Sequence, residues 1–340
     1  MLYQLILVFS ANIFSPKTMD EKIHLKHDEI NQVVHIYCGE ELFTSYRYDS
    51  TQEKPVLYPL IASDGQRVTR KYPLEYSVGE RVDHPHHVGM WLNYGDVNGL
   101  DFWNNSTEKS KDDPTKYGWI KHDDILEMSD GQIGTLVVCA RWEDHLGTVL
   151  LLEETAYTFS SNQDTRQIIR QTTLKALDQE VRFEDNKEGM FGIRVARALE
   201  LPSDKAVLLS GPDGKPATEK VITNEGVTGN YLSSAGLKGG DVWGTRAEWM
   251  MLHGQVEGHQ TSIVIADHPE NPGFPTYWHA RGYGLFAANP LGQAVFSKGK
   301  EQMNFSLKPN AKAIFRHLVL VHSGSQLTAV EIDQRTTDFK

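Results

Sequence analysis

The 340-residue sequence contains only two cysteines and, beyond its first residues, no long apolar run. Cys38 and Cys139 lie far apart and neither belongs to a CxxC pair, so nothing indicates a zinc ribbon or a redox motif. We expect two buried free thiols, with a single disulfide between them as the alternative. Because the first apolar residues are too few to span a bilayer stably and no other segment is apolar enough, an integral membrane role is not expected.

The sequence also lacks a run of basic residues, and its formal net charge is -11. Nucleic-acid phosphates and anionic lipid surfaces repel an acidic chain, so neither is expected as a main partner. The hydrophobic share of 39% is that of an ordinary globular protein. A chain of this length can bury a substantial core without disulfides.

Several catalytic signatures are missing. We find no HExxH, no P-loop, no GxGxxG that opens a helix and no GxSxG. Phosphoryl transfer, dinucleotide binding and serine hydrolysis therefore have no support in the sequence.

Within residues 1–18, the stretch MLYQLILVFSANIFSP is mostly apolar and resembles the apolar part of a secretory signal, although no Lys or Arg precedes that part. Two interpretations stay open: a signal peptide, or a disordered extension ahead of Met19. The first predicts a periplasmic or secreted protein, and the second predicts a cytoplasmic one. We expect residues 19–340 to form a single β-sandwich domain, since no charge break or proline-rich hinge divides them.

Short segments with a period near two dominate the sequence and predict an all-β fold. Residues 31–48 alternate around a turn at Gly39, and residues 134–144 and 149–161 form two strands around His145, Leu146 and Gly147. Val, Ile, Thr and aromatic residues fill these segments. Further strands are expected at 165–177, 262–269 and 313–324, and weak helices at 219–226 and 330–340. The pattern favours a large antiparallel β-sandwich.

The segment 84–87 holds three histidines in four positions, next to Asp83. In an extended chain His84 and His86 share one face and His87 takes the other. Imidazoles can relay protons, bind a metal or grip hydroxyls. Alternatively, they satisfy buried backbone groups around a tight turn. Three together favour a functional site.

Residues 91–103 bring tryptophans and acids next to these histidines. Trp91 and Trp103 either pack in the core or offer flat apolar faces that suit sugar rings. Asp96 and Asp101 have nearly the spacing of a calcium loop, but the glycine is misplaced. A turn capped by Asp side chains is the simpler interpretation.

Two later segments carry further candidates. Glu188 lies in a group of acids before a strand-like run, where it acts as a general acid or base or belongs to a solvated turn. In the proline-rich segment 267–292, His279 and Arg281 alternate, so an extended chain presents both on one face. Arg281 can clamp a carboxylate or a hydroxyl pair, and Tyr283 either donates a proton or packs.

Four stretches together resemble a bacterial family of unknown function that is often catalogued as PmoA-like, a label that we interpret as a misnomer. The stretches are HPHHVGMWLNYGDVNGLDFW (84–103), EDNKEGMFGIRVA (184–196), VWGTRAEW (242–249) and DHPENPGFPTYWHARGYGLFAANPLG (267–292). The resemblance spans roughly residues 30–325. It implies a fold similar to the galactose-mutarotase-like supersandwich. By analogy, the histidine motif, Glu188 and the His279–Arg281 segment converge on one face of a sheet.

These features predict a carbohydrate-active enzyme, a mutarotase-like epimerase, lyase or hydrolase, that acts on a small molecule or an oligosaccharide. The alternatives are a noncatalytic sugar-binding module and a metal-dependent enzyme with His84, His86 and an acid as ligands. No cofactor is predicted, apart from the divalent metal of that last alternative. Catalytic candidates are His84, His86, His87, Glu188, His279 and Arg281, and substrate-binding candidates are Trp91, Asp96, Asp101, Trp103, Arg194, Trp278 and Tyr283.

Overall fold

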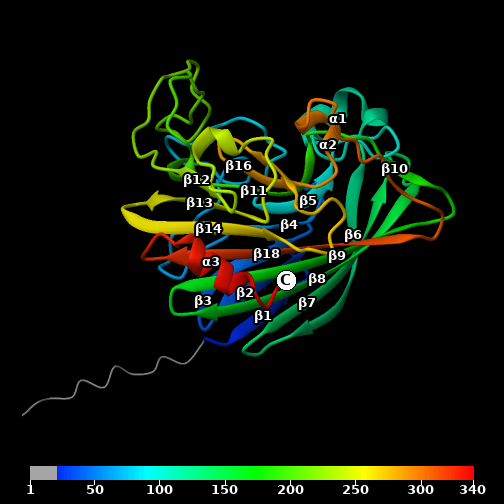
Figure 1. The fold of residues 1–340 in the computed structure, drawn as a ribbon, viewed down its shortest axis with the longest axis horizontal. Helices are drawn as coiled ribbons and strands as arrows, with labels where there is room; N and C mark the ends of the chain where they lie inside the picture. The colour runs from blue at the N-terminus through cyan, green and yellow to red at the C-terminus, as the bar shows by residue number, and fades with distance from the viewer. Residues whose placement is uncertain (1–20) are drawn as a thin grey trace, which may run out of the picture.

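A computed structural model of the chain describes residues 21–340, so the interpretations of residues 1–18 lie outside the described residues. The described residues form two eight-stranded antiparallel sheets that pack face to face (Figure 1). The strand order is β1-β2-β3-β4-β5-β11-β16-β15 in the first sheet and β12-β13-β14-β18-β9-β8-β7-β6 in the second. This architecture confirms the expected large antiparallel sandwich.

The strands and helices have the following bounds, given sheet by sheet. The first sheet contains β1 (Ile23–Asp28), β2 (Val33–Cys38), β3 (Glu41–Arg47), β4 (Val56–Leu57), β5 (Met90–Tyr94), β11 (Gly189–Arg194), β15 (Tyr277–Ala280) and β16 (Leu285–Asn289). The second contains β6 (Trp119–Ser129), β7 (Gly134–Glu143), β8 (Val149–Asn162), β9 (Thr165–Ala176), β12 (Asn230–Ser233), β13 (Trp249–Val256), β14 (His259–Asp267) and β18 (Lys312–Ser323). Strands β10 (Val181–Phe183) and β17 (Phe305–Leu307) pair separately, and the helices are α1 (Thr107–Asp112), α2 (Gln293–Phe296) and α3 (Ala329–Thr336).

The long hairpins follow from local sequence. Residues of β7 alternate strictly between buried and partly buried, which is the period of a strand with one face on the core. The β7–β8 turn ends at Gly147, whose φ of +82° is easily adopted without a Cβ. The hairpin β2–β3 turns at Gly39, as the alternation predicts.

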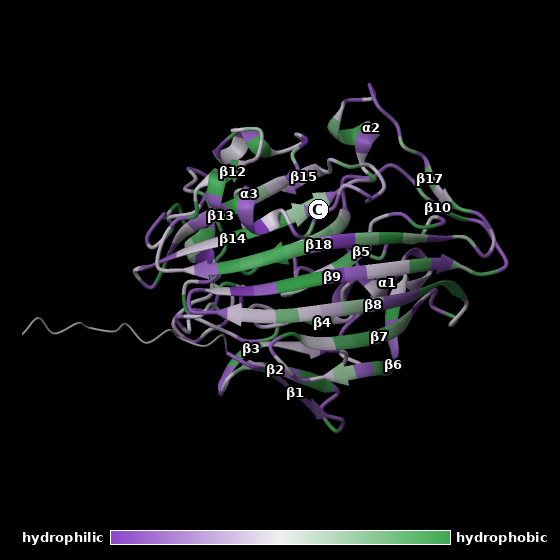
Figure 2. Ribbon diagram, turned by 60° about the horizontal axis from the view of Figure 1, so that its bottom comes forward, coloured by the Kyte–Doolittle hydropathy of each residue, from purple (hydrophilic) through white to green (hydrophobic). Residues whose placement is uncertain are grey.

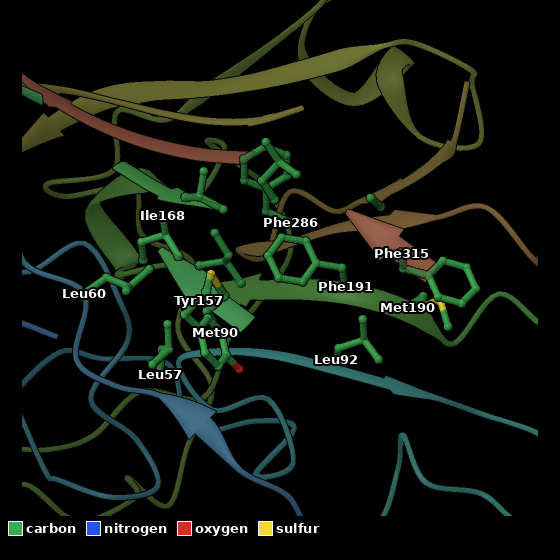
Figure 3. Packing of buried hydrophobic residues seen from close by; sticks show 14 of the residues in the cluster. Leu57, Leu60, Met90, Leu92, Tyr157, Ile168, Met190, Phe191, Phe286 and Phe315 are labelled. Atoms are coloured by element: carbon green, nitrogen blue, oxygen red, sulfur yellow. The ribbon is translucent and has the colours of Figure 1, made fainter. Parts of the chain in front are cut away.

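The main core lies between the two sheets (Figure 3). Each large apolar side chain that is removed from water there stabilises the fold by about 1.5–3 kcal/mol. The first sheet contributes Met90, Leu92, Phe191 and Phe286, and the second contributes Tyr157, Ile168 and Phe315.

Helix α3 covers the outer face of the second sheet, over β13, β14 and β18 (Figure 2). Its N-terminus has a capping box in which Thr328 and Glu331 satisfy each other's backbone N–H groups. Ile332 packs into the apolar cluster on these strands, and Trp249 Nε1 donates to Asp333 at 2.7 Å. Because both faces of β18 are covered, most of its residues are buried rather than alternating.

Two local expectations need correction. Residues 219–226 form no helix: Val221 pairs in a β-bridge with Val207, and Gly226 has a φ of +70°. Cys38 and Cys139 are both free, but only Cys38 is buried. A helix at the C-terminal end of the sequence is confirmed as α3. Across residues 21–340, none of the helices has the length and apolar character needed to cross a membrane.

The outer face of the first sheet is where the candidate site forms. In β5, Met90 and Leu92 enter the main core, whereas Trp91 belongs to a separate cluster on the other face. In β15, Trp278 enters the core and His279 takes the opposite face. Strands β5, β11, β16 and β15 are adjacent, so their outward side chains share one surface.

Candidate functional site

The three histidines of the opening motif lie on a tight turn. The backbone N–H of His87 donates to the carbonyl of His84 at 3.0 Å, with Pro85 and His86 as the central residues. The turn brings the His84 and His87 rings into a parallel stack 5.0 Å apart, and the Tyr283 ring stacks on His84 at 4.9 Å. The expected pairing of His84 with His86 is therefore wrong, because a turn places residues i and i+3 together.

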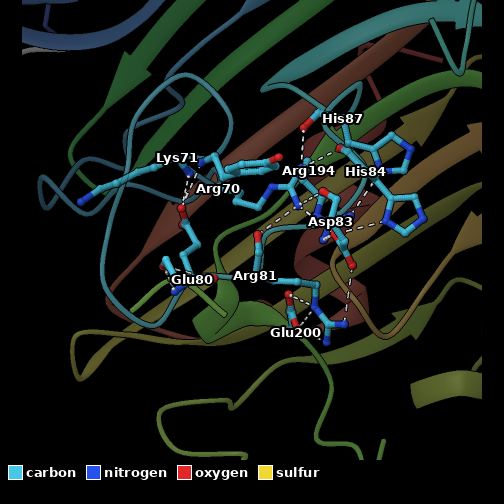
Figure 4. Close-up of polar contacts among 11 residues, drawn as sticks. Arg70, Lys71, Glu80, Arg81, Asp83, His84, His87, Arg194 and Glu200 are labelled. Carbon is cyan, nitrogen blue, oxygen red and sulfur yellow. Dashed lines mark hydrogen bonds and ion pairs between the residues drawn. The ribbon is translucent and has the colours of Figure 1, made fainter. Parts of the chain in front are cut away.

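A buried arginine, Arg70, binds the backbone of this turn (Figure 4). Arg70 donates to the carbonyl oxygens of Asp83 (2.7 Å), His84 (2.9 Å) and His87 (3.1 Å). Burial lowers the pKa of Arg70 to about 9, so its guanidinium stays charged at neutral pH. The three charge-assisted bonds fix the path of the loop that carries the histidines.

Asp83 is the common acceptor of this network. Its Oδ1 accepts from Arg70 at 2.9 Å and from Arg194 of β11 at 2.6 Å. Burial opposes ionisation, but Arg194, His84 and Arg70 outweigh it and hold the pKa of Asp83 below its ordinary value. Asp83 is therefore a carboxylate at every physiological pH.

His84 is the histidine of this motif that reaches solvent. Its Nδ1 is buried 3.1 Å from Asp83 Oδ1, where the two atoms attract without the alignment of a hydrogen bond. The side chain is nevertheless 40% exposed, so the opposite ring edge, with Nε2, carries the exposure. A carboxylate behind an imidazole and a free nitrogen in front is an arrangement suited to proton transfer.

His87 supports this arrangement from the interior. Its Nδ1 accepts from Arg194 at 3.2 Å, so its proton is on Nε2, and its ring stacks on Trp91 at 5.3 Å. Burial and the neighbouring His86 hold its pKa well below the ordinary value, so the ring is neutral. With 1% of its surface exposed, His87 positions His84 and does not reach a substrate.

A second imidazole faces a carboxylate on the same side of the sheet. His279 Nδ1 has no hydrogen-bond partner and lies 3.9 Å from Glu188 Oε2. Burial, helped by Lys187 and Arg281, lowers the pKa of His279 to about 3, so it is neutral. Glu188 forms an ion pair with Lys187 and keeps 19% of its side chain exposed.

Trp103 joins the two imidazole groups. Its ring centroid lies 5.6 Å from that of His87 and 6.4 Å from that of His279. Trp91 packs beside it at 5.3 Å. The histidine motif, Glu188 and the His279 segment therefore converge on one face, as the resemblance implies.

Arg281 and Tyr283 border this surface. The Arg281 guanidinium lies 5.4 Å from the Trp243 ring centroid and 5.7 Å from that of Tyr283. Within residues 21–340 no carboxylate lies within ion-pair distance of Arg281. Burial raises the pKa of Tyr283, so its hydroxyl keeps a proton to donate.

The remaining candidates offer no surface to a substrate or serve local turns. Trp278 is fully buried in the main core. Side chains alternate along β15, so His279 faces the site and Trp278 faces the core. Trp91 and Trp103 are also buried and offer no open face. Asp96 and Asp101 accept from Gly99 N and Asn104 N within their own turns, which is the simpler of the two interpretations.

The metal-dependent alternative finds no ligand set in the part of the chain that the structure describes. The rings of His84 and His86 are 5.7 Å apart and nearly perpendicular. Among residues 21–340, no group of three His, Cys, Asp or Glu side chains is placed to hold a metal ion.

Sequence analysis missed Arg70 and Trp243 as parts of the site. Arg70 lies in a stretch without a motif, and its buried charge becomes meaningful only beside Asp83, thirteen residues away. Trp243 lies in VWGTRAEW (242–249), one of the four stretches that carry the family resemblance, and this was the signal that could have identified it.

Comparisons with known proteins give a family and a distant fold likeness. Over 90% of this chain and 99% of the other, the structure aligns with a galactose mutarotase-like protein from Clostridium acetobutylicum at 10% identity and a TM-score of 0.40. The Slr1438 protein from Synechocystis sp. PCC 6803 aligns over 96% of this chain and 100% of its own, at 10% identity and a TM-score of 0.30. No curated protein matches the sequence.

The family model of DUF6807, a family of unknown function, matches residues 33–337. The match confirms the expected membership in a family of unknown function, and it does not bear on the PmoA-like label. The match covers most of the sequence, and the chain therefore belongs to the DUF6807 family.

Proposed function

We propose that the outer face of β5, β11, β16 and β15 is the active site of a carbohydrate-converting enzyme that uses acid–base chemistry. The observation that carries the proposal is the convergence of two imidazole–carboxylate pairs, His84 with Asp83 and His279 with Glu188, on one surface. One pair has a solvent-facing nitrogen and the other an unpartnered nitrogen. Titratable groups held in contrasting environments are typical of acid–base sites.

The two pairs have different roles in the proposed chemistry. His84 accepts a proton at its exposed Nε2 from a substrate hydroxyl or an acidic C–H, and the fixed charge of Asp83 stabilises the imidazolium that forms. The His84 imidazolium then gives this proton to a substrate oxygen, so the proton count balances. His279 Nδ1 is buried 3.9 Å from Glu188 Oε2, so the neutral imidazole positions Glu188, and this partly exposed carboxylate accepts a hydrogen bond from a substrate hydroxyl.

The surroundings suit a polyhydroxylated substrate. Arg281 offers guanidinium donors that no protein carboxylate within the described ranges occupies, and Tyr283 offers a hydroxyl. These donors match pairs of sugar hydroxyls, with or without a carboxylate.

The experiment is turnover across a saccharide panel by wild type, His84→Ala and His279→Asn. We expect a loss of about 10²–10⁴-fold in kcat from His84→Ala, the size of a general acid or base contribution, and a smaller loss from His279→Asn, which changes the setting of Glu188. His145→Ala in the exposed β7–β8 turn is the matched control and keeps full activity. Unchanged activity in both site variants contradicts the proposal, and saturable binding without product indicates a sugar-binding module instead.

A further inference from the structure

A cavity lies on the His86 side of the histidine turn. Its volume of about 190 Å³ is far above the ~10–15 Å³ that one water molecule needs. It is therefore large enough for a solute. The lining residues, which we call the Tyr76 pocket, are Thr51, Gln52, Glu53, Lys54, Tyr72, Pro73, Tyr76, Pro85, His86, Val88, Ser106, Thr107 and Glu108.

The Tyr76 pocket contains polar groups that the protein leaves unsatisfied. His86 Nδ1 and Ser106 Oγ are buried without a hydrogen-bond partner, and each residue is 4% exposed. Lys54, 5% exposed, donates to the carbonyl of His86 at 2.8 Å and has two further N–H donors. A buried polar group without a hydrogen-bond partner costs the folded protein free energy. A ligand with several hydroxyls would recover that cost.

Part of the lining is aromatic and apolar. The rings of Tyr72 and Tyr76 lie 6.4 Å apart, and Pro73 lies between them in the sequence. Tyr76 is 63% exposed, so it forms the rim and can stack on a ligand without disturbing the core. Aromatic faces together with hydroxyl and imidazole groups match a sugar ring, which has apolar C–H faces and polar edges.

The charges of the lining disfavour an anionic ligand. Lys54 contributes one positive charge, whereas Glu53 and Glu108 contribute two negative charges, so the formal sum is -1. A phosphate or a carboxylate gains nothing from this balance. A neutral, hydroxylated ligand fits it.

The Tyr76 pocket is next to the proposed active site. The His86 ring lies 4.3 Å from that of His87 and 5.7 Å from that of His84. The pocket and the His84 surface thus share the histidine turn as a wall. We propose that the Tyr76 pocket binds a neutral sugar unit of an oligosaccharide whose next unit is converted at His84. The proposal rests on the proposed function and adds the substrate class, an oligosaccharide with a neutral unit.

The test measures calorimetric binding of cellobiose, maltose and xylobiose, and of the matching monosaccharides, to the full chain carrying His279→Asn. We expect a disaccharide to bind more tightly than its monosaccharide. Tyr76→Ala should reduce disaccharide affinity by about tenfold, equivalent to ~1.4 kcal/mol. Tyr37→Ala in β2, outside the pocket, is the matched control and leaves the affinity unchanged.

Two results overturn the inference: no saccharide of the panel binds, or disaccharide affinity is unchanged by both Tyr76→Ala and Ser106→Ala. Circular dichroism of each variant checks that the fold is retained, and the exposed Tyr76 side chain supports no core packing. Failure of the proposed function appears separately. In that case His84→Ala and His279→Asn remain fully active, whereas disaccharide binding to the pocket persists.

Discussion

Folding keeps His279 neutral, and this predicts a measurable acid sensitivity. The ordinary pKa of 6.5 applies in the unfolded chain, and burial lowers the folded-state pKa to about 3. Below pH ~6.5, His279 binds a proton in the unfolded state but not in the folded state, so the free energy of unfolding decreases. The loss begins near the unfolded-state pKa, grows as pH falls and levels off at the folded-state pKa.

The magnitude follows from the two pKa values. At about pH 5.5 the unfolded chain gains about 1.4 kcal/mol from protonating this residue, against about 0.2 kcal/mol at pH ~7. Replacement by asparagine removes the titration, so His279→Asn should lose about 1.2 kcal/mol less stability than wild type over this interval.

The assay is urea unfolding followed by tryptophan fluorescence at both pH values. The quantity compared is the change in unfolding free energy between the two pH values, which cancels any constant cost of the substitution. His145→Asn, on an exposed turn, should keep the wild-type change. Equal changes in wild type and His279→Asn would refute the reasoning, since they would mean that the imidazole protonates in the folded state.

Three other substitutions have definite expected outcomes. Glu153→Ala should cost about 3–5 kcal/mol in chemical denaturation, because it leaves the buried Arg170 guanidinium without its ion-pair partner at 2.9 Å; a cost below about 1 kcal/mol would contradict this. Gly89→Ala should lower Tm by several degrees, since φ there is +56° and a Cβ would collide with the backbone of a neighbouring strand; an unchanged Tm would show that the loop adjusts. Asp83→Asn should reduce kcat more than it raises KM, because His84 loses the charge that stabilises its imidazolium; equal effects on both constants would assign Asp83 a purely structural role.

The sheets could be predicted because their signals are local. The alternation in 134–144 and 149–161 and the turn at Gly147 define a hairpin whose residues contact their sequence neighbours. The same alternation failed at His84–His87, because Pro85 favours a turn and the turn changes which rings meet. A period of two describes extended chain only.

The site was harder to predict because it depends on which face of each strand meets the core and on ion pairs between residues that are distant in the sequence. Alternation shows that Trp278 and His279 face opposite sides but not which side carries the core, and the tryptophan was assigned to the wrong one. The roles of the buried Arg70 and Arg194 become clear only from their hydrogen bonds to Asp83, and the three residues come from separate segments of the chain. Single-sequence patterns do not contain such pairings.

Helix α3 has a consequence for synthesis. It is made after every strand that it covers, so the apolar residues on the outer face of β13, β14 and β18 face water until the helix docks. During that interval the nascent sheet presents an adhesive surface to chaperones and to other copies of the chain. Variants that weaken Trp249–Asp333 docking would lengthen the interval and reduce soluble yield, even if the site on the other sheet were intact.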